Sequence, residues 1–110
     1  MGRIILPKKV RPHKIMLFVS DTCKPCMGMV DELIKNQRNI MYEIIEIMDL
    51  SPWGSTPYAC DYAADWNVTR VPTLVVVSNI TGEPVEKIVG DKHILQNLKR
   101  ICEKYWARNV

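Results

Sequence analysis

The segment KIMLFVSDTCKPC, residues 14–26, decides how this chain folds. Residues 14–19 form an almost continuous apolar run, which is typical of a strand buried on both faces. A short polar turn follows, and apolar residues then recur at helical spacing over about 25–38. We therefore expect a buried strand that turns directly into a helix, with Cys23 and Cys26 at the junction.

The rest of the chain alternates between predicted strands and helices and closes with a hairpin and a helix. These elements are a strand over 40–48, a helix over 56–66, strands over 73–78 and 84–89, and a helix over 91–106. Thr56 and Pro57 suit the N-cap and first residue of the middle helix, and a short extra strand is expected near Ile4. The order βαβ, α, ββα predicts an α/β fold, a mixed central sheet covered by helices, in one domain of residues 1–110.

Composition and charge favour an ordinary globular protein. Of the 110 residues, 47% are hydrophobic and 25% are charged, and the net charge is only +3. The basic residues do not cluster with aromatic ones on one face, so we expect no nucleic-acid partner. Five basic residues precede any acidic one, and they form either a phosphate-seeking arm or a solvated leader: Arg3, Lys8, Lys9, Arg11 and Lys14.

No stretch of the sequence has the pattern of a secretory signal or a membrane span. The apolar residues 4–6 are cut short by Pro7, and the longest later apolar stretch, residues 74–77, is far too short to cross a bilayer. We therefore expect a cytoplasmic protein and no membrane partner. Thiols are normally kept reduced there, so the four cysteines favour redox or metal chemistry over a disulfide framework.

The Cys23-Lys24-Pro25-Cys26 segment carries the chemistry. Residues at this separation become neighbours once the segment is helical, so a disulfide can open and close with little backbone movement. A thiol has an ordinary pKa of about 8.5, and a helix N-terminus stabilises its anion. Lys24 adds a neighbouring cation, and Pro25 fits the first turn of a helix. We expect Cys23 to attack and Cys26 to resolve the mixed disulfide.

Three other interpretations of the cysteine pair are open. A structural zinc site commonly needs two such pairs, and only one short spacing is present. A purely structural disulfide is disfavoured by a reducing compartment, and a single pair can also arise by coincidence.

Among the other cysteines, Cys102 is expected in the core and Cys60 either packs or is a secondary oxidation site. The apolar stripe of the last helix is expected to be buried: Ile94, Leu95, Leu98, Ile101, Cys102 and Tyr105.

A second signal is the proline that opens the strand over 73–78. Proline cannot donate to a sheet ladder, so Pro72 belongs at a strand's start, and such a position can host a cis bond. Several features then occur together: Cys23-Lys24-Pro25-Cys26 after a buried strand, Val71-Pro72-Thr73, Gly90 before the last helix, Asp49, and residues 67–70. In this combination the chain resembles the thioredoxin family over about residues 14–105.

The resemblance implies a thioredoxin-like fold and a protein-disulfide reductase, which we expect to act as a monomer. Because no nucleotide-binding motif and only one short cysteine spacing are present, we expect no bound cofactor or metal. The resemblance implies that Pro72 is cis and packs against the cysteine pair. It also implies a docking groove for an extended substrate peptide. The residues of that groove would be Thr22, Lys24, Val71, Thr73 and Gly90.

Departures from the family's pattern affect the mechanism. Thr22 and Lys24 stand where thioredoxins usually carry tryptophan and glycine, and Leu17 stands where they bury an aspartate. Without that carboxylate, Cys26 lacks its usual proton acceptor, unless Glu43 or Glu46 turns inward.

Three functions follow as hypotheses. The first is reduction of protein disulfides, with electrons from a reductase, because no nucleotide-binding motif is present. The second is a glutaredoxin-like activity with glutathione, favoured by a short N-terminal segment and by Lys24. Against it, Gly90 and the residues after it lack the double glycine and acidic residues of glutathione-binding relatives. The third is a binding subunit with dispensable cysteines, which would use the loop at residues 52–54 and Tyr58.

Overall fold

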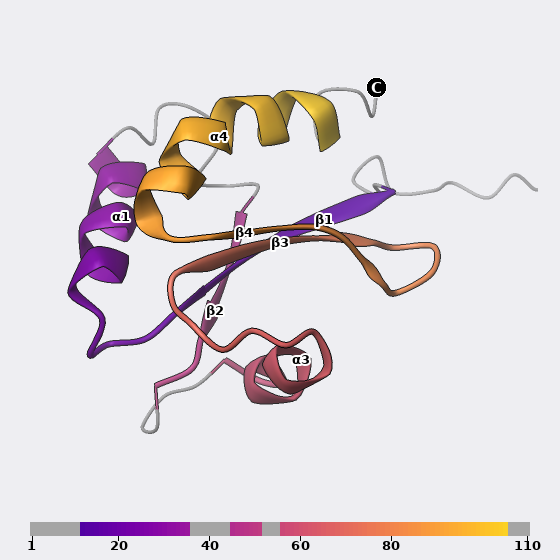
Figure 1. Cartoon of the computed structure of the whole chain (residues 1–110), viewed down its shortest axis with the longest axis horizontal. Coiled ribbons are helices and arrows are strands. Elements are labelled where there is room, and N and C mark those ends of the chain that lie inside the picture. The colour runs from indigo at the N-terminus through magenta and orange to yellow at the C-terminus, as the bar shows by residue number, and fades with distance from the viewer. Residues whose placement is uncertain (1–11, 36–44, 52–55, 106–110) are drawn as a thin grey trace, which may run out of the picture.

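The computed structural model describes residues 12–35, 45–51 and 56–105. A four-stranded sheet in the order β2-β1-β3-β4 lies between two helical layers (Figure 1). The elements are β1 (His13–Val19), α1 (Lys24–Lys35), β2 (Ile45–Asp49), α3 (Ala59–Asp65), β3 (Thr73–Ser78), β4 (Pro84–Val89) and α4 (Asp91–Tyr105). Strand β1 pairs in parallel with β2 and antiparallel with β3, and β3 pairs antiparallel with β4. The predicted mixed sheet is therefore confirmed.

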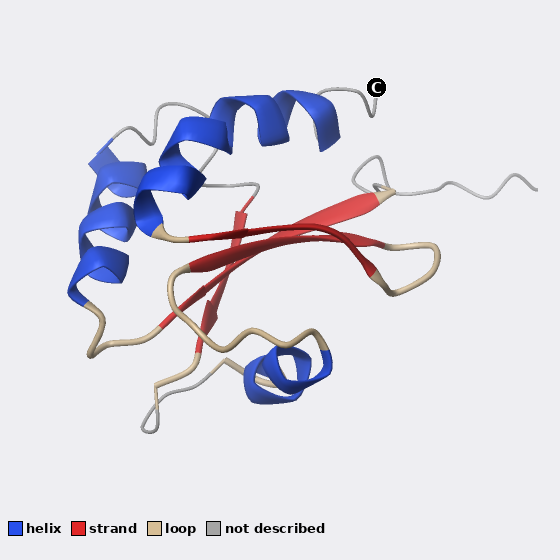
Figure 2. Ribbon diagram, viewed as in Figure 1, coloured by secondary structure: helices blue, strands red, loops and turns tan. Residues whose placement is uncertain are grey.

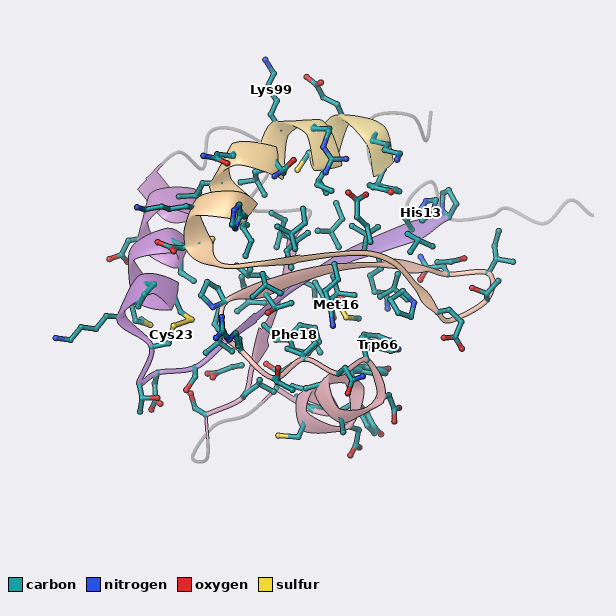
Figure 3. All side chains as sticks on the ribbon, in the orientation of Figure 1. His13, Met16, Phe18, Cys23, Trp66 and Lys99 are labelled. Carbon is teal, nitrogen blue, oxygen red and sulfur yellow. A yellow bond between two sulfur atoms is a disulfide. The ribbon has the colours of Figure 1, made fainter. Side chains whose placement is uncertain are left out.

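Helices α1 and α4 cover one face of the sheet, and α3 covers the other (Figure 2). Successive residues of a strand point to opposite faces, so the central strand β1 supplies both layers. Ile15 and Leu17 pack beneath α1 and α4, whereas Met16 and Phe18 lie on the side of α3 (Figure 3). Complete burial of one such side chain is worth about 1.5–3 kcal/mol. The apolar run that predicted a strand buried on both faces is explained by these two layers.

Helix α4 buries the expected stripe with one exception. Ile94, Leu98 and Ile101 lie against the sheet, but Leu95 is 42% exposed. The prediction that Leu95 is buried was wrong because consecutive helical residues point about 100° apart. Ile94 faces the sheet, so Leu95 points beyond the surface that the sheet covers.

Helix α3 begins later than the sequence predicts. Its N-cap is Tyr58, which has a left-handed backbone (φ 66°) and makes no side-chain capping hydrogen bond. Thr56 is used elsewhere, since its hydroxyl accepts the N–H of Asp49 at 2.8 Å. Its own N–H donates to the Asp49 carbonyl at 2.9 Å. The Thr56 N-cap and the Pro57 N1 position were therefore wrong predictions, because Thr56 extends the hydrogen bonding of β2.

Several predicted features lie outside the described residues. They are the strand near Ile4, the helix end and strand start within 36–44, the loop at 52–54, Glu43 and Trp106. Among residues 12–35, 45–51 and 56–105, no helix is both long and apolar enough to cross a bilayer.

Candidate active site

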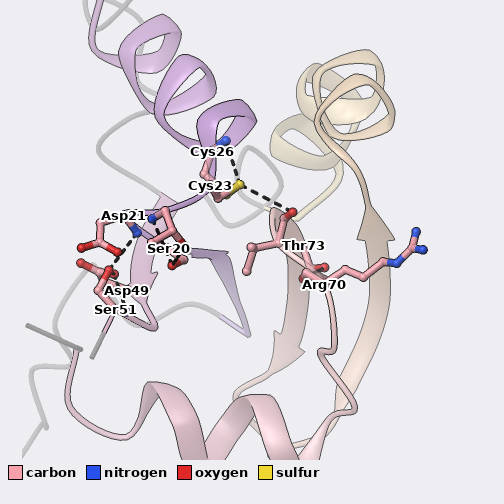
Figure 4. The surroundings of a disulfide bond; sticks show 10 residues. Ser20, Asp21, Cys23, Cys26, Asp49, Ser51, Arg70 and Thr73 are labelled. Atoms are coloured by element: carbon pink, nitrogen blue, oxygen red, sulfur yellow. Dashed lines mark hydrogen bonds between the residues drawn. A yellow bond between two sulfur atoms is a disulfide. The ribbon is translucent and has the colours of Figure 1, made fainter. Parts of the chain in front are cut away.

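Cys23 and Cys26 are joined by a disulfide at the start of α1 (Figures 3 and 4). Their Cα atoms are 5.2 Å apart, within the usual range for such a bond. Cys26 is fully buried against the sheet, and Cys23 is partly exposed. The two sulfurs are therefore unequal, because only Cys23 of this pair is accessible to solvent.

A backbone N–H of α1 points at the sulfur of Cys23. Cys23 immediately precedes the helix, and its Sγ accepts the N–H of Cys26 at 3.1 Å. Its carbonyl accepts the N–H of Met27 at 3.2 Å, which is the first helical hydrogen bond. A sulfur anion here would face unpaired N–H groups and the positive end of the helix dipole. The exposed side chains of Lys24 and Pro25 occupy the first turn.

Residues from another part of the chain form the wall opposite this helix. The Val71–Pro72 peptide bond is cis, and the Val71 carbonyl oxygen lies 3.7 Å from the Sγ of Cys23. Pro72 is buried, and its carbonyl accepts the N–H of Gly90 at 3.0 Å. The loop before β3 and the turn before α4 are thus tied together beside the disulfide.

Thr73 and Gly90 fix the backbone of these two loops. Thr73 is 1% exposed, and its hydroxyl donates to the carbonyl of Arg70 at 2.7 Å (Figure 4). Its main chain lies inside the sheet between β1 and β4. Gly90 has a left-handed backbone (φ 99°), which favours glycine, and its carbonyl accepts the N–H of Ile94.

The opposite rim is formed by the turn that precedes Cys23. Thr22 is exposed, and its hydroxyl lies 3.1 Å from the hydroxyl of Ser20. Cys23 donates its N–H to the Ser20 carbonyl at 3.1 Å. The structure therefore brings together the predicted site residues of two distant segments, 22–26 and 71–73. Thr73 is buried rather than on the surface.

Solved structures of similar shape identify the fold. A scan of protein-family models and a search of curated proteins found no match. Thioredoxin f2 of Chlamydomonas reinhardtii superposes with a TM-score of 0.59 at 17% identity, over 87% of this chain and 81% of that one. The reduced Schistosoma mansoni thioredoxin pre-protein gives 0.60 at 17% identity, over 86% and 80%. A mutant thioredoxin of Halobacterium salinarum gives 0.57 at 24% identity, over 86% and 75%.

This chain has the thioredoxin fold. Within that fold the disulfide lies where β1 meets α1, and the cis proline lies where β3 begins. The expected fold class is confirmed by both the sheet order and the neighbours.

Leu17 lies in the interior of the fold, close to the cysteine pair. It is 1% exposed and packs in the same cluster as Cys26, with Cys23 at its margin. Glu46 of β2 is exposed, so it does not turn inward toward the cysteine pair. The second sulfur is therefore surrounded by apolar side chains.

The other two cysteines lie apart from the disulfide. Cys102 is on the buried side of α4, and burial raises the pKa of its thiol to about 11. The expectation that it packs in the core is confirmed. Cys60 is exposed on α3, across the sheet from Cys102. Within the part of the chain that the structure describes, no three His, Cys, Asp or Glu residues are grouped as metal ligands would be.

Ser51 also lies beside the site, although no sequence motif singles it out. Its buried hydroxyl accepts the N–H of Asp21, two residues before Cys23, at 2.9 Å. One local signal was available, because an aspartate often accepts the N–H two residues later, as Asp49 does from Ser51.

Proposed function

We propose that this chain is a thiol–disulfide oxidoreductase that reduces the disulfides of partner proteins through Cys23 and Cys26. The observation that carries the proposal is the unequal pair at the start of α1. Cys23 is accessible and accepts a backbone N–H, whereas Cys26 is buried directly behind it.

The reaction exchanges two electrons and two protons. The thiolate of reduced Cys23 attacks one sulfur of the partner's disulfide, and the other partner sulfur leaves as a thiolate. Cys26 then loses its proton and attacks the sulfur of Cys23. The Cys23–Cys26 disulfide forms, the mixed disulfide breaks, and the second partner sulfur leaves as a thiolate. It takes from water the proton that Cys23 released on ionising, so the partner departs with two thiols. The N–H of Cys26 supports the first step because it stabilises the attacking anion.

Proton removal from Cys26 differs from the usual scheme of the thioredoxin fold. Leu17 offers no carboxylate, and Glu46 points to solvent. We expect the departing thiolate of the partner, which is a stronger base than the Cys23 anion, to take this proton directly or through water. Resolution then depends on the substrate that is bound.

The docking groove lies between the two rims of the site. Val71 presents backbone beside the sulfur of Cys23, and Thr22 and Lys24 are exposed on the other side. An extended peptide that pairs with main-chain groups at Val71 would place its disulfide over Cys23. Thr73 and Gly90 contribute by fixing this backbone. Recognition of this kind is broad rather than sequence-specific.

The proposal places this chemistry in the cytoplasm, in a monomer without a bound cofactor. A reductant must be re-reduced after each turnover, and the cytoplasm maintains thiols in the reduced state. The electron donor is either a reductase or glutathione, and the two donors give different outcomes in an assay.

The test is catalytic reduction of insulin disulfides by purified protein. One arm supplies thioredoxin reductase with NADPH, and the other supplies glutathione with glutathione reductase and NADPH. We expect turnover in the first arm, its loss in Cys23→Ser, and its retention in Cys60→Ser. Turnover only with glutathione would instead support the glutaredoxin-like activity. If neither Cys23→Ser nor the unaltered protein showed turnover in either arm, only a binding role would be left.

A further inference from the structure

The end of β2 is connected to the turn that carries Cys23. Strand β2 runs parallel to β1 and ends level with it, with Val19 opposite Asp49. The N–H of Leu50 continues the pairing by donating to the Val19 carbonyl at 2.9 Å. The residues after β2 are thereby held beside the residues that lead from β1 into α1.

Ser51 makes the connection through its side chain. It is 3% exposed, and its hydroxyl accepts the N–H of Asp21 at 2.9 Å (Figure 4). The same hydroxyl donates its hydrogen to a carboxylate oxygen of Asp49 at 2.5 Å. That oxygen also accepts the N–H of Ser51 at 2.9 Å. A hydroxyl has one hydrogen, so the Asp49 carboxylate orients it and leaves its lone pairs directed at Asp21.

The anchored turn contacts Cys23 directly. Asp21 precedes Cys23 by two residues, and the carbonyl of Ser20 accepts the N–H of Cys23 at 3.1 Å. The position of the Cys23 sulfur relative to the N–H of Cys26 depends on this turn, because Cys23 is the residue at which the turn becomes helix.

We propose that Ser51 and Asp49 are positioning residues for the Cys23 sulfur, acting through the N–H of Asp21. The inference rests on the proposed function. It holds that residues at the end of β2, outside the cysteine motif, fix the geometry of the reactive sulfur. Ser51 holds the turn, and Asp49 fixes the hydroxyl of Ser51. A looser turn would weaken the hydrogen bond from Cys26 to the sulfur, and the Cys23 anion would become harder to form.

Ser51→Ala tests this role, and Ser78→Ala is the matched control. Ser78 is also a buried serine, 9% exposed, whose hydroxyl accepts two backbone N–H groups, those of Ile80 and Thr81. It lies at the end of β3 that is farthest from Thr73 and the disulfide. Both changes remove a buried hydroxyl that shapes a turn, but only one of the turns leads to Cys23.

The measurement is the rate of iodoacetamide alkylation of Cys23 in the fully reduced protein, followed from pH 5 to 10 by peptide mass spectrometry. We expect Ser51→Ala to move the half-maximal rate upward by about one pH unit, and the rate at pH 6 to fall about ten-fold. Ser78→Ala should leave the profile unchanged despite a comparable loss in Tm. Asp49→Ala should shift the profile in the same direction by a smaller amount.

Two results would overturn the positioning role. One is an equal shift in Ser51→Ala and Ser78→Ala, since a general loss of stability would then explain both. The other is an unchanged profile in Ser51→Ala, or in Asp49→Ala if Ser51→Ala does not fold. Alkylation needs no substrate or reductase, so a failure here is separate from a failure of insulin reduction by the unaltered protein.

Discussion

The N–H of Cys26 donates to the sulfur of Cys23 across the first turn of α1, at 3.1 Å. In the proposed reaction, the residue that resolves the mixed disulfide would therefore also help to activate the attacking sulfur. Its own sulfur is buried, so in the proposed reaction Cys26 would serve the first step through its backbone and the second through its side chain.

This arrangement predicts selective alkylation of the reduced pair. Near pH 7, a small excess of iodoacetamide should modify Cys23 and leave Cys26 unmodified, because only Cys23 is accessible and faces the helix terminus. The pH profile of Cys23 should reach half its maximum below the value of about 8.5 that is typical of a free thiol. Peptide mass spectrometry checks both statements, and preferential labelling of Cys26 would contradict them.

Cys102 should be unreactive in the folded protein. Its pKa is raised to about 11 by burial, so at pH 8 it is a neutral thiol without access to reagent. Native protein should therefore be alkylated at Cys60 but not at Cys102, and urea should expose Cys102. Labelling of both at similar rates without denaturant would show that α4 opens readily.

The hydroxyl of Thr73 should matter for substrate binding as well as stability. Thr73→Val removes its hydrogen bond to the Arg70 carbonyl, at a cost of about 1 kcal/mol. The loop that presents Val71 then loosens, so we expect KM for insulin to rise several-fold with a smaller change in kcat. Thr81→Val is the control, since the hydroxyl of Thr81 accepts an exposed N–H of Glu83 in the distant hairpin. Equal kinetic effects of the two variants would rule out this role.

Glu86 links β4 to α4 and gives a pH-dependent contribution to stability. It accepts hydrogen bonds from Arg100 at 2.7 Å and from the hydroxyl of Tyr105 at 2.6 Å. The bond to Arg100 is the largest cause that lowers the pKa of Glu86 below its ordinary 4.5, although burial opposes it. A lowered carboxyl pKa stabilises the folded state above pH 4.5, and this contribution is lost as pH falls through the lower folded value.

Glu86→Gln should therefore lower Tm at neutral pH, because it removes the ion pair with Arg100. The decrease should be only a few degrees, because this ion pair is partly exposed. The difference from the unaltered protein should shrink as the pH falls below 4.5. Thermal unfolding followed by circular dichroism at several pH values measures both effects. A constant difference across the whole range would show that the charge of Glu86 is not involved.

Local patterns predicted most of the sheet and the cysteine pair. The β1 run and the helical spacing after it are properties of neighbouring residues, so the position of Cys23 at the junction followed from sequence. Leu17, too, was correctly placed inside. The start of α3 was missed because Thr56 bonds to Asp49 at the end of β2, a contact that local capping rules do not contain.

The proposed role of Ser51 could not be found by the same means. Its hydrogen bond to Asp21 joins residues 30 positions apart, and it exists only because β2 lies parallel to β1 in this register. Residue types at the cysteine motif indicate which atoms we propose to react. The contacts that hold those atoms in place come from the packing of distant strands.

Capture of the mixed disulfide tests the central claim most directly. The Cys26→Ser variant, reduced and then mixed with insulin, should retain the substrate as a covalent adduct, because the second sulfur that would release it is missing. Tandem mass spectrometry should locate the bond at Cys23, and Cys23→Ser should form no such adduct. An adduct at Cys60, or none at all, would contradict the assignment of Cys23 as the attacking sulfur.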